Sequence, residues 1–359
     1  MLDARARSQV RWDVEVVGKG MDVTRQREIP SQGVQCVAFR GGKRSHAIHD
    51  LNLVSEAILE SGHLVWVDLV NPSVADYAKL QSEFDLHPLA IEDAQTAHER
   101  PKIEQYPSYL FLIVQPASWT GDRLITHELA IFAGHRFLVT IRRTPEYAID
   151  EAERRWDVHD GELGDDAGFL LYTLLDTIVD GYFPIGDRLE EWIGDLQTNL
   201  FSAEADPRQL NDMLREIFEL KQDVHHARRA VVPMRDILQP LVRGDLKIFK
   251  ADRERYYRDV YDHAIRVIDQ LDSARDLVNS ALEIHLSLVA NRQNEVSKQL
   301  AIIATIFLPL TYVTGFFGQN FGWMVNGITS RGTFFYLGIG IEIVCLVVLI
   351  AYFRIKKWF

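Results

Sequence analysis

The stretch NEVSKQLAIIATIFLPLTYVTGFFGQN, residues 294–320, lies near the C-terminal end of the chain. Its segment Leu300–Phe317 contains 18 residues and no charge. As a helix this segment would be about 27 Å long, close to the thickness of the hydrocarbon core of a bilayer. A second apolar run, Thr333–Phe353, contains a single charged residue, Glu342. We therefore predict two membrane-spanning helices that follow a long and more polar part of the chain.

The loop between the two predicted spans begins with GFFGQN, which ends at Asn320. Together with IIATIFLPLTY before it, this loop resembles the Gly-Met-Asn signature of the CorA family of divalent-cation channels, with Gln319 in place of the methionine. The segment LHPLAIEDAQTAHERPKIEQYPSYLFLIV, residues 86–114, is similar to the cytosolic signature of that family. The resemblance covers roughly residues 60–359, and it implies the fold and the activity of the family.

The first half of the chain alternates short runs rich in Val, Ile and Phe with helical patterns, which is typical of an α/β domain. A helix is expected at Val74–Phe84 with Ser73 as its N-cap, and a second one near Pro88. The expected strands are Val34–Arg40, Leu64–Leu69, Tyr109–Gln115, His127–Ala133 and Phe137–Arg142.

After an acidic connector at residues 156–168 the pattern is helical, with helices at about 168–200 and 206–241. A last helix is expected from Leu246 to Phe317, which is 72 residues and about 108 Å. Its apolar positions form a seam that we expect several copies of the chain to bury together: Ile265, Ile268, Leu271, Val278, Leu282 and Val289.

These patterns predict an α+β membrane protein with a cytosolic α/β domain, a long helical stalk and two C-terminal transmembrane helices per subunit. The predicted divisions are a loose leader (1–30), the α/β domain (31–166), the helical region with the stalk (167–298), the first span (299–317), the outer loop (318–332), the second span (333–353) and a basic tail (354–359).

Composition limits the partners of this chain. With 39 basic and 51 acidic residues the net charge is −12, which argues against nucleic acid and suits a protein that handles cations. The N-terminal MLDARARSQV lacks an apolar signal segment, and basic residues flank both spans on their outer sides while the loop between them carries only Arg331. We expect a multi-pass protein of the plasma or inner membrane with both termini in the cytosol.

One face of the first span carries small and polar side chains. Two spans cannot enclose an aqueous pore, so a channel requires several copies, and the resemblance implies a homopentamer lined by this helix. The alternative is close packing between helices, which also favours small residues. The predicted pore-lining residues are Asn294, Ser297, Ala301, Ala304, Leu308, Thr311 and Gly315.

Gly318, Gln319 and Asn320 are the predicted selectivity filter. Mg²⁺ loses its water reluctantly, so a ring of amide and carbonyl oxygens suits the hydrated ion. Gly315 and Gly318 are expected to permit the turn, and an ordinary turn asparagine is the alternative for Asn320. Gln319 adds an amide where the family has methionine, which leaves the Mg²⁺/Co²⁺ preference open.

The resemblance also implies gates and regulatory metal ligands. Leu300 and Leu308 match apolar gate positions, while Asn294 and Thr311 match polar rings. Asp93 and Asp259 match a Mg²⁺ site between neighbouring subunits, and Glu283 matches an acid at the inner pore entrance; the alternative for each acid is a solvated helix face. Mg²⁺ is thus expected both as the transported and as the regulatory ion.

Glu342 matches no residue carried over from the family. A carboxyl within a span is costly and suggests a function. The alternative, which we favour for this residue, is a protonated side chain bonded to a neighbouring hydroxyl. No phosphate-binding loop is present, since GGKRS at 41–45 lacks the required spacing, and no enzymatic activity is expected.

We therefore predict a homo-oligomeric channel that admits hydrated Mg²⁺, and also Co²⁺ or Ni²⁺, down the electrochemical gradient under the control of cytosolic Mg²⁺. Two alternatives stay open. One is a zinc transporter of the same superfamily with proton coupling, and the other is a membrane-anchored Mg²⁺ sensor that conducts no ion.

Overall fold

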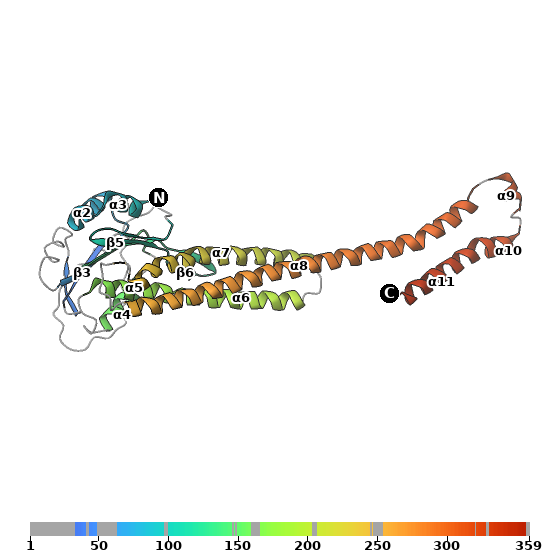
Figure 1. Cartoon of the computed structure of the whole chain (residues 1–359). Helices are drawn as coiled ribbons and strands as arrows, with labels where there is room; N and C mark the ends of the chain where they lie inside the picture. The colour runs from blue at the N-terminus through green and yellow to red at the C-terminus, as the bar shows by residue number, and fades with distance from the viewer. Residues whose placement is uncertain are drawn as a thin grey trace, which may run out of the picture.

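The computed structural model describes residues 33–40, 43–48, 63–96, 100–145, 147, 149–158, 166–202, 207–244, 246, 254–319, 321–327 and 330–356. Within these ranges a head with a β-sheet leads into a helical bundle, from which one helix continues alone before the chain turns back (Figure 1). The predicted leader, residues 1–30, lies outside the described residues.

The head contains a seven-stranded sheet in the order β2-β1-β3-β9-β8-β5-β4, with a separate β6–β7 hairpin. Only β3 and β9 run parallel, and the other pairs are antiparallel. The five predicted strands are confirmed, whereas four short and more polar strands escaped the pattern analysis (β2, β4, β6 and β7). The bounds are β1 Gly33–Arg40, β2 Lys43–Ile48, β3 His63–Val70, β4 Lys102–Gln105, β5 Tyr109–Val114, β6 Ala117–Thr120, β7 Arg123–Thr126, β8 Leu129–Gly134 and β9 Phe137–Arg142.

Both faces of the sheet are buried, which explains uninterrupted apolar strands such as YLFLIV in β5. Leu110, Leu112 and Val114 belong to the core shared with the helical bundle. The alternate residues of β5 pack under α2 (Val74–Phe84) and α3 (Pro88–Gln95), which cover the opposite face (Figure 1). The sheet therefore has α2 and α3 on one face and the helical bundle of the later residues 150–281 on the other.

Local capping begins α2 and α3 as predicted. Ser73 Oγ accepts a hydrogen bond from the Asp76 backbone N, and Asp76 Oδ2 accepts one from the Ser73 backbone N at 2.8 Å, which completes a capping box. His87 caps α3, with Nδ1 accepting from the Leu89 backbone N at 3.2 Å and Pro88 at the first helical position.

The helices after the sheet differ from their predicted ranges. The expected connector is partly helical, because α4 (Asp150–Val158) buries Ala152 and Trp156 against the head. The expected helix at 168–200 is two helices, α5 (Ala167–Asp180) and α6 (Phe183–Ser202), which are separated at Gly181 and Tyr182. The antiparallel partner of the stalk is α7 (Pro207–Arg243).

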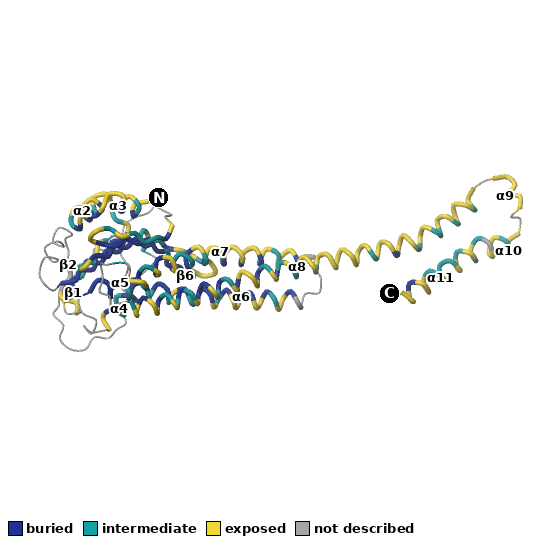
Figure 2. The backbone as a smooth tube through the Cα atoms, in the orientation of Figure 1, coloured by how far each residue is buried: buried dark blue, intermediate teal, exposed yellow. Residues whose placement is uncertain are grey.

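The stalk helix α8 spans Glu254–Phe317, 64 residues, rather than beginning at Leu246. Gly244 adopts a left-handed conformation with φ of 68° directly after α7, which ends helical geometry there. The prediction that its seam needs other copies of the chain is wrong for most positions, because α6 and α7 already pack on it (Figure 2). Ile268, Leu271 and Val278 are buried within a single chain.

The C-terminal part is apolar and nearly uncovered within one chain. After α8 come α9 (Gly322–Gly327), α10 (Arg331–Thr333), a π-helix η3 (Phe334–Ile339) and α11 (Gly340–Ile355), which returns along α8 (Figure 1). Two helices are long and apolar enough to cross a bilayer, and their most apolar windows are only 6% and 0% buried. Such surfaces require lipid or further protein to cover them.

Candidate ion pathway and metal site

The outer part of α8 has two opposite faces. Its partly covered positions follow one stripe at spacings of four, three, four and four, and this stripe lies on the side where α11 packs: Ile302, Ile306, Pro309, Val313 and Phe317. The predicted pore-lining residues, from Asn294 to Gly315, are all exposed. At 100° per residue the two sets point about 150° apart. The predicted pore face is therefore the one that α11 leaves bare.

Side chains on this bare face divide into apolar and polar levels. Leu300 and Leu308, the predicted gates, are 63% and 71% exposed. Thr311 Oγ1 donates a hydrogen bond to the Phe307 carbonyl oxygen at 2.8 Å. Because the hydroxyl hydrogen is used in this bond within the helix, the lone pairs of Oγ1 face outward. Lone pairs in this position can accept hydrogen bonds from the water shell of a cation.

The predicted filter lies just past the end of α8. The backbone N of Gly318 donates to the Thr314 carbonyl at 2.9 Å, and that of Gln319 donates to the Phe316 carbonyl at 3.3 Å. Asn320 lies outside the described residues. The expectation that Gly315 permits the turn is wrong, because this residue lies within α8 and Gly318 is the first residue beyond the helix.

Asp93 on α3 is held by a lysine of its own chain. Lys102 Nζ lies 2.6 Å from Asp93 Oδ2 and 2.8 Å from Glu104 Oε1. Burial acts to lower the pKa of Lys102, but its hydrogen bonds to Asp93 and Glu104 raise it overall. The ammonium thus stays charged and pairs with Asp93 within a single chain.

Asp259 on α8 lies in a cluster that sequence patterns did not reveal. Ligand atoms of Asp176, Asp259 and His263 all lie within 4.8 Å of one another, joining α5 to the inner end of the stalk helix. Two carboxylates and an imidazole fit divalent cations, and the nitrogen donor suits Co²⁺ or Zn²⁺ better than Mg²⁺. The i, i+4 spacing of Asp259 and His263 was the one available sequence signal.

The guanidinium of Arg155 borders this cluster and pairs with Asp176 and with the neighbouring Asp180. Arg155 Nη1 lies 2.8 Å from Asp176 Oδ2 and 2.7 Å from Asp180 Oδ2, and His263 Nδ1 lies 3.3 Å from Asp180 Oδ1. Burial and the charge of Asp180 raise the pKa of Asp176, against the opposite effects of Arg155 and His263. A divalent cation bound here would offset the repulsion between the carboxylates of Asp176 and Asp180.

The structure does not bring the predicted regulatory acids together within one chain. Asp93 lies on the helix layer above the sheet, while Asp259 lies in the helical layer on the other side (Figure 1). Glu283 is exposed farther along α8. Any site that combines Asp93 with Asp259 must therefore join two copies of the chain.

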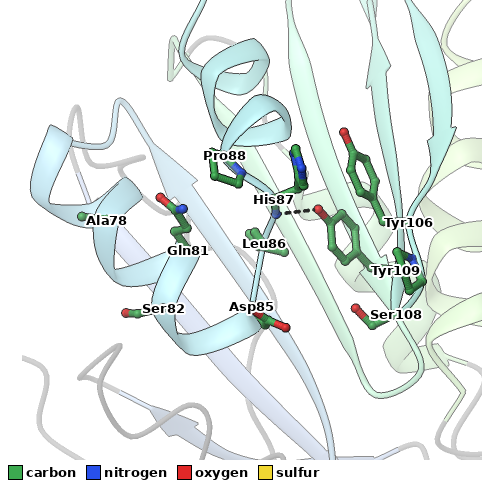
Figure 3. Close-up of a pocket in the computed structure, with 11 residues that line it drawn as sticks. Ala78, Gln81, Ser82, Asp85, Leu86, His87, Pro88, Tyr106, Ser108 and Tyr109 are labelled. Carbon is green, nitrogen blue, oxygen red and sulfur yellow. Dashed lines mark hydrogen bonds between the residues drawn. The ribbon is translucent and has the colours of Figure 1, made fainter.

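A cavity of about 520 Å³ opens between α2, α3 and the turn that joins β4 to β5 (Figure 3). The rings of Tyr106 and Tyr109 stack in the wall of this cavity, with their centroids 4.8 Å apart. Tyr109 Oη accepts a hydrogen bond from the His87 backbone N at 2.9 Å. Burial and the neighbouring Glu104 raise the pKa of Tyr106 to about 12. These side chains serve the packing of the head and lie away from the ion pathway.

Comparison with known proteins places these features in context. The family model "CorA-like Mg2+ transporter protein" matches residues 61–357. The chain is 28% identical to the cobalt/magnesium transport protein CorA of Thermotoga maritima over 83% of this chain and 84% of that protein, and 26% identical to the zinc transport protein ZntB of Cronobacter sakazakii over 83% and 88%. The complete structure of the CorA magnesium transporter from Methanocaldococcus jannaschii superposes with a TM-score of 0.74 at 23% identity, covering 90% of this chain and 98% of that one.

Proposed function

Since the chain belongs to the CorA-like Mg²⁺ transporter family and is a membrane protein with two C-terminal spans, we propose that several copies of it, five by family resemblance, form a channel for hydrated Mg²⁺. Both termini lie in the cytosol, so the head and stalk face the cytosolic end of the pore. Co²⁺ and Ni²⁺, which share the hydrated octahedral geometry, are further candidate ions.

The observation that carries this proposal is the division of α8 into two faces. One stripe is covered by α11 of the same chain, and the opposite face, with Ala301, Ala304 and Thr311, is exposed although it lies in the most apolar part of the molecule. Small and hydroxyl side chains allow helices of neighbouring subunits to surround a narrow column of water. Leu300 and Leu308 then form apolar rings that close the column when it narrows.

Selection of the ion is assigned to Gly318, Gln319 and Asn320 at the outer mouth. Amide and carbonyl oxygens accept hydrogen bonds from the water that Mg²⁺ retains, and they hold the ion less tightly than a ring of carboxylates would. The amide of Gln319 adds a second possible ring of oxygens, which supports a preference for fully hydrated ions.

Gating is assigned to divalent cations at the heads. Asp93 of one copy and Asp259 of its neighbour form the inter-subunit site, and Asp176 and His263 lie beside Asp259 to complete its oxygen and nitrogen donors. When cytosolic Mg²⁺ falls, the carboxylates repel one another, the interface loosens and α8 can move. Glu283, exposed on the stalk, attracts cations toward the inner entrance.

The decisive experiment is ion uptake into proteoliposomes that hold a Mg²⁺ dye. Asn320→Ala should abolish uptake, and the matched control Asn326→Ala, an exposed asparagine in the same loop, should retain it. Equal uptake by both variants would refute the assignment of the filter. Uptake of neither Mg²⁺ nor Zn²⁺ by folded, oligomeric wild-type protein would leave the sensor as the function.

A zinc transporter remains the second candidate, because a zinc transport protein is among the relatives and the cluster around Asp259 contains an imidazole donor. The same liposomes with a Zn²⁺ dye and an imposed proton gradient distinguish the two. Zn²⁺ entry that follows the proton gradient, with no Mg²⁺ entry, would replace the magnesium channel by this candidate.

A further inference from the structure

Glu342, the one charged residue within the second span, lies on the covered stripe of its helix. Apart from Gly340 at its start, the partly or fully buried positions of α11 fall on one stripe of the helix: Glu342, Cys345, Leu346, Leu349 and Phe353. Ile341, Ile343 and Val344 on either side are exposed. Because α11 packs against α8, we assign the Glu342 side chain to the seam between the two spans rather than to the outer surface of the hairpin.

A π-turn directly before Glu342 accounts for this orientation. The Gly340 backbone N–H donates to the Phe335 carbonyl, a five-residue step, at the end of the π-helix Phe334–Ile339. Thr333 and Gly338, five residues apart, are both partly covered. A π-turn holds one residue more than an α-turn and so rotates the faces of the helix that follows it. Without this extra residue the covered stripe would pass through other positions, and Glu342 would turn away from α8.

The seam offers this carboxyl no countercharge. Between residues 299 and 319 α8 contributes no Asp, Glu, Lys, Arg or His, and its one titratable side chain there is Tyr312, which is exposed. The π-helix contributes Tyr336, and α11 itself contributes Cys345 and Tyr352. The nearest basic residues along the chain, Arg331 and Arg354, stand at the two ends of the span. A neutral carboxylic acid fits such a seam, whereas an ionised carboxylate there is costly.

We propose that Glu342 is a proton-binding site inside the membrane that controls the packing of α11 on the pore helix. With the proton bound, the acid is neutral and the seam closes. When the proton passes to water, the carboxylate draws water into the seam and α11 separates from α8. The consequence for ion flow rests on the proposed channel function, but the opening of the seam does not.

Cys345 provides a native probe of the seam, because it lies three residues from Glu342 on the same stripe. Full-length protein in liposomes is treated with a membrane-permeant maleimide between about pH 6 and about pH 9, a range that separates neutral from ionised carboxyls in apolar surroundings. The reaction at each cysteine is followed by mass spectrometry. Cys36 serves as the unreactive reference, since it is 4% exposed and burial raises its pKa to about 12.

The comparison is between wild type and Glu342→Gln, which keeps the shape of the acid but cannot ionise. The ratio of Cys345 reaction rates, wild type over variant, should rise from near one at acid pH to roughly tenfold at alkaline pH, an estimate set by the cost of a charge within a span. The ionisation of the thiol itself cancels in this ratio. A ratio that stays near one at every pH would overturn the proposal.

Ion uptake by the same liposomes tests the consequence. Wild-type uptake should change with pH, uptake by Glu342→Gln should be flat, and the control Glu295→Gln, an exposed acid on α8 before the span, should follow wild type. A rising thiol ratio without uptake of any ion would defeat the channel and leave the proton site standing. Uptake by wild type and Glu342→Gln with the same pH profile and an unchanging thiol ratio would defeat the proton site alone.

Discussion

Lys102 Nζ lies 2.6 Å from Asp93 Oδ2, so a candidate regulatory carboxylate is already paired with a cation of its own chain. The side chains of both residues are 28% exposed, so water still reaches the pair. A divalent cation that binds Asp93 must compete with this ammonium. In the proposed inter-subunit site, this pair would therefore set how much cytosolic cation is needed to hold neighbouring heads together.

Replacing Lys102 by Gln should make the regulatory site tighter. A partly exposed ion pair contributes up to about 1 kcal/mol, so the concentration of Mg²⁺ that half-protects the heads from limited proteolysis should fall by as much as about fivefold. Lys79→Gln, which changes an exposed lysine on α2, is the control and should match wild type. A Lys102→Gln midpoint equal to that of wild type would mean that Asp93 takes no part in binding.

The cluster of Asp176, Asp259 and His263 should bind a divalent cation and stabilise the folded head. At a free Co²⁺ concentration about 100 times the dissociation constant, the free energy of unfolding should rise by about 2.7 kcal/mol. His263→Ala should remove most of this gain, measured as the shift in thermal midpoint on adding Co²⁺. His225→Ala, an exposed histidine on α7, should keep it. Equal shifts in both variants would exclude the cluster as the binding site.

Asp176 should make stability depend on pH. Its pKa is raised in the folded protein above the ordinary value of 3.8, chiefly by burial and then by Asp180. The folded state therefore holds this proton more tightly than the unfolded state. The contribution of Asp176 to the free energy of unfolding is therefore most favourable at pH values below 3.8. It is lost as the pH rises through the raised pKa of the folded protein.

Asp176→Asn should flatten this decline in the metal-free protein, as measured by denaturant unfolding at a series of pH values above about 4. Asp269→Asn, an exposed acid on α8, should preserve the wild-type profile. If the profile of Asp176→Asn kept the wild-type slope, the pH dependence would have to arise at other groups.

Enlarging a small residue on the bare face of α8 should block the pathway. Ala304→Leu adds three carbon atoms to each subunit at the same level, and we expect uptake to fall by roughly tenfold or more because the apolar ring narrows and loses its water. Val344→Leu adds a methylene group to a residue of α11 that is 61% exposed, away from α8, and should conduct like wild type. Assembly of both variants is checked by size-exclusion chromatography, and normal uptake by assembled Ala304→Leu would place the pore elsewhere.

Local sequence patterns determined most of the fold. The two apolar runs predicted both spans, and their length alone carries that information because a bilayer has a set thickness. The run YLFLIV predicted a strand, and Ser73 and Pro88 marked helix starts, all of which the structure confirms. Four short strands and the break at Gly181 escaped notice, because their formation depends on neighbours distant in the chain.

Only the tertiary structure decided which side chains from different helices and strands lie next to one another. Asp176 lies on α5, whereas Asp259 and His263 lie on α8, so no spacing along the chain could reveal that Asp176 meets the other two. The pairing of Asp93 with Lys102 depends on how α3 lies over β4. The direction of Glu342 depends on a π-turn, in which one additional residue rotates the helix that follows. Hydrophobic lengths and caps act locally and can be read along the chain, whereas contacts between elements exist only after packing has brought distant segments together.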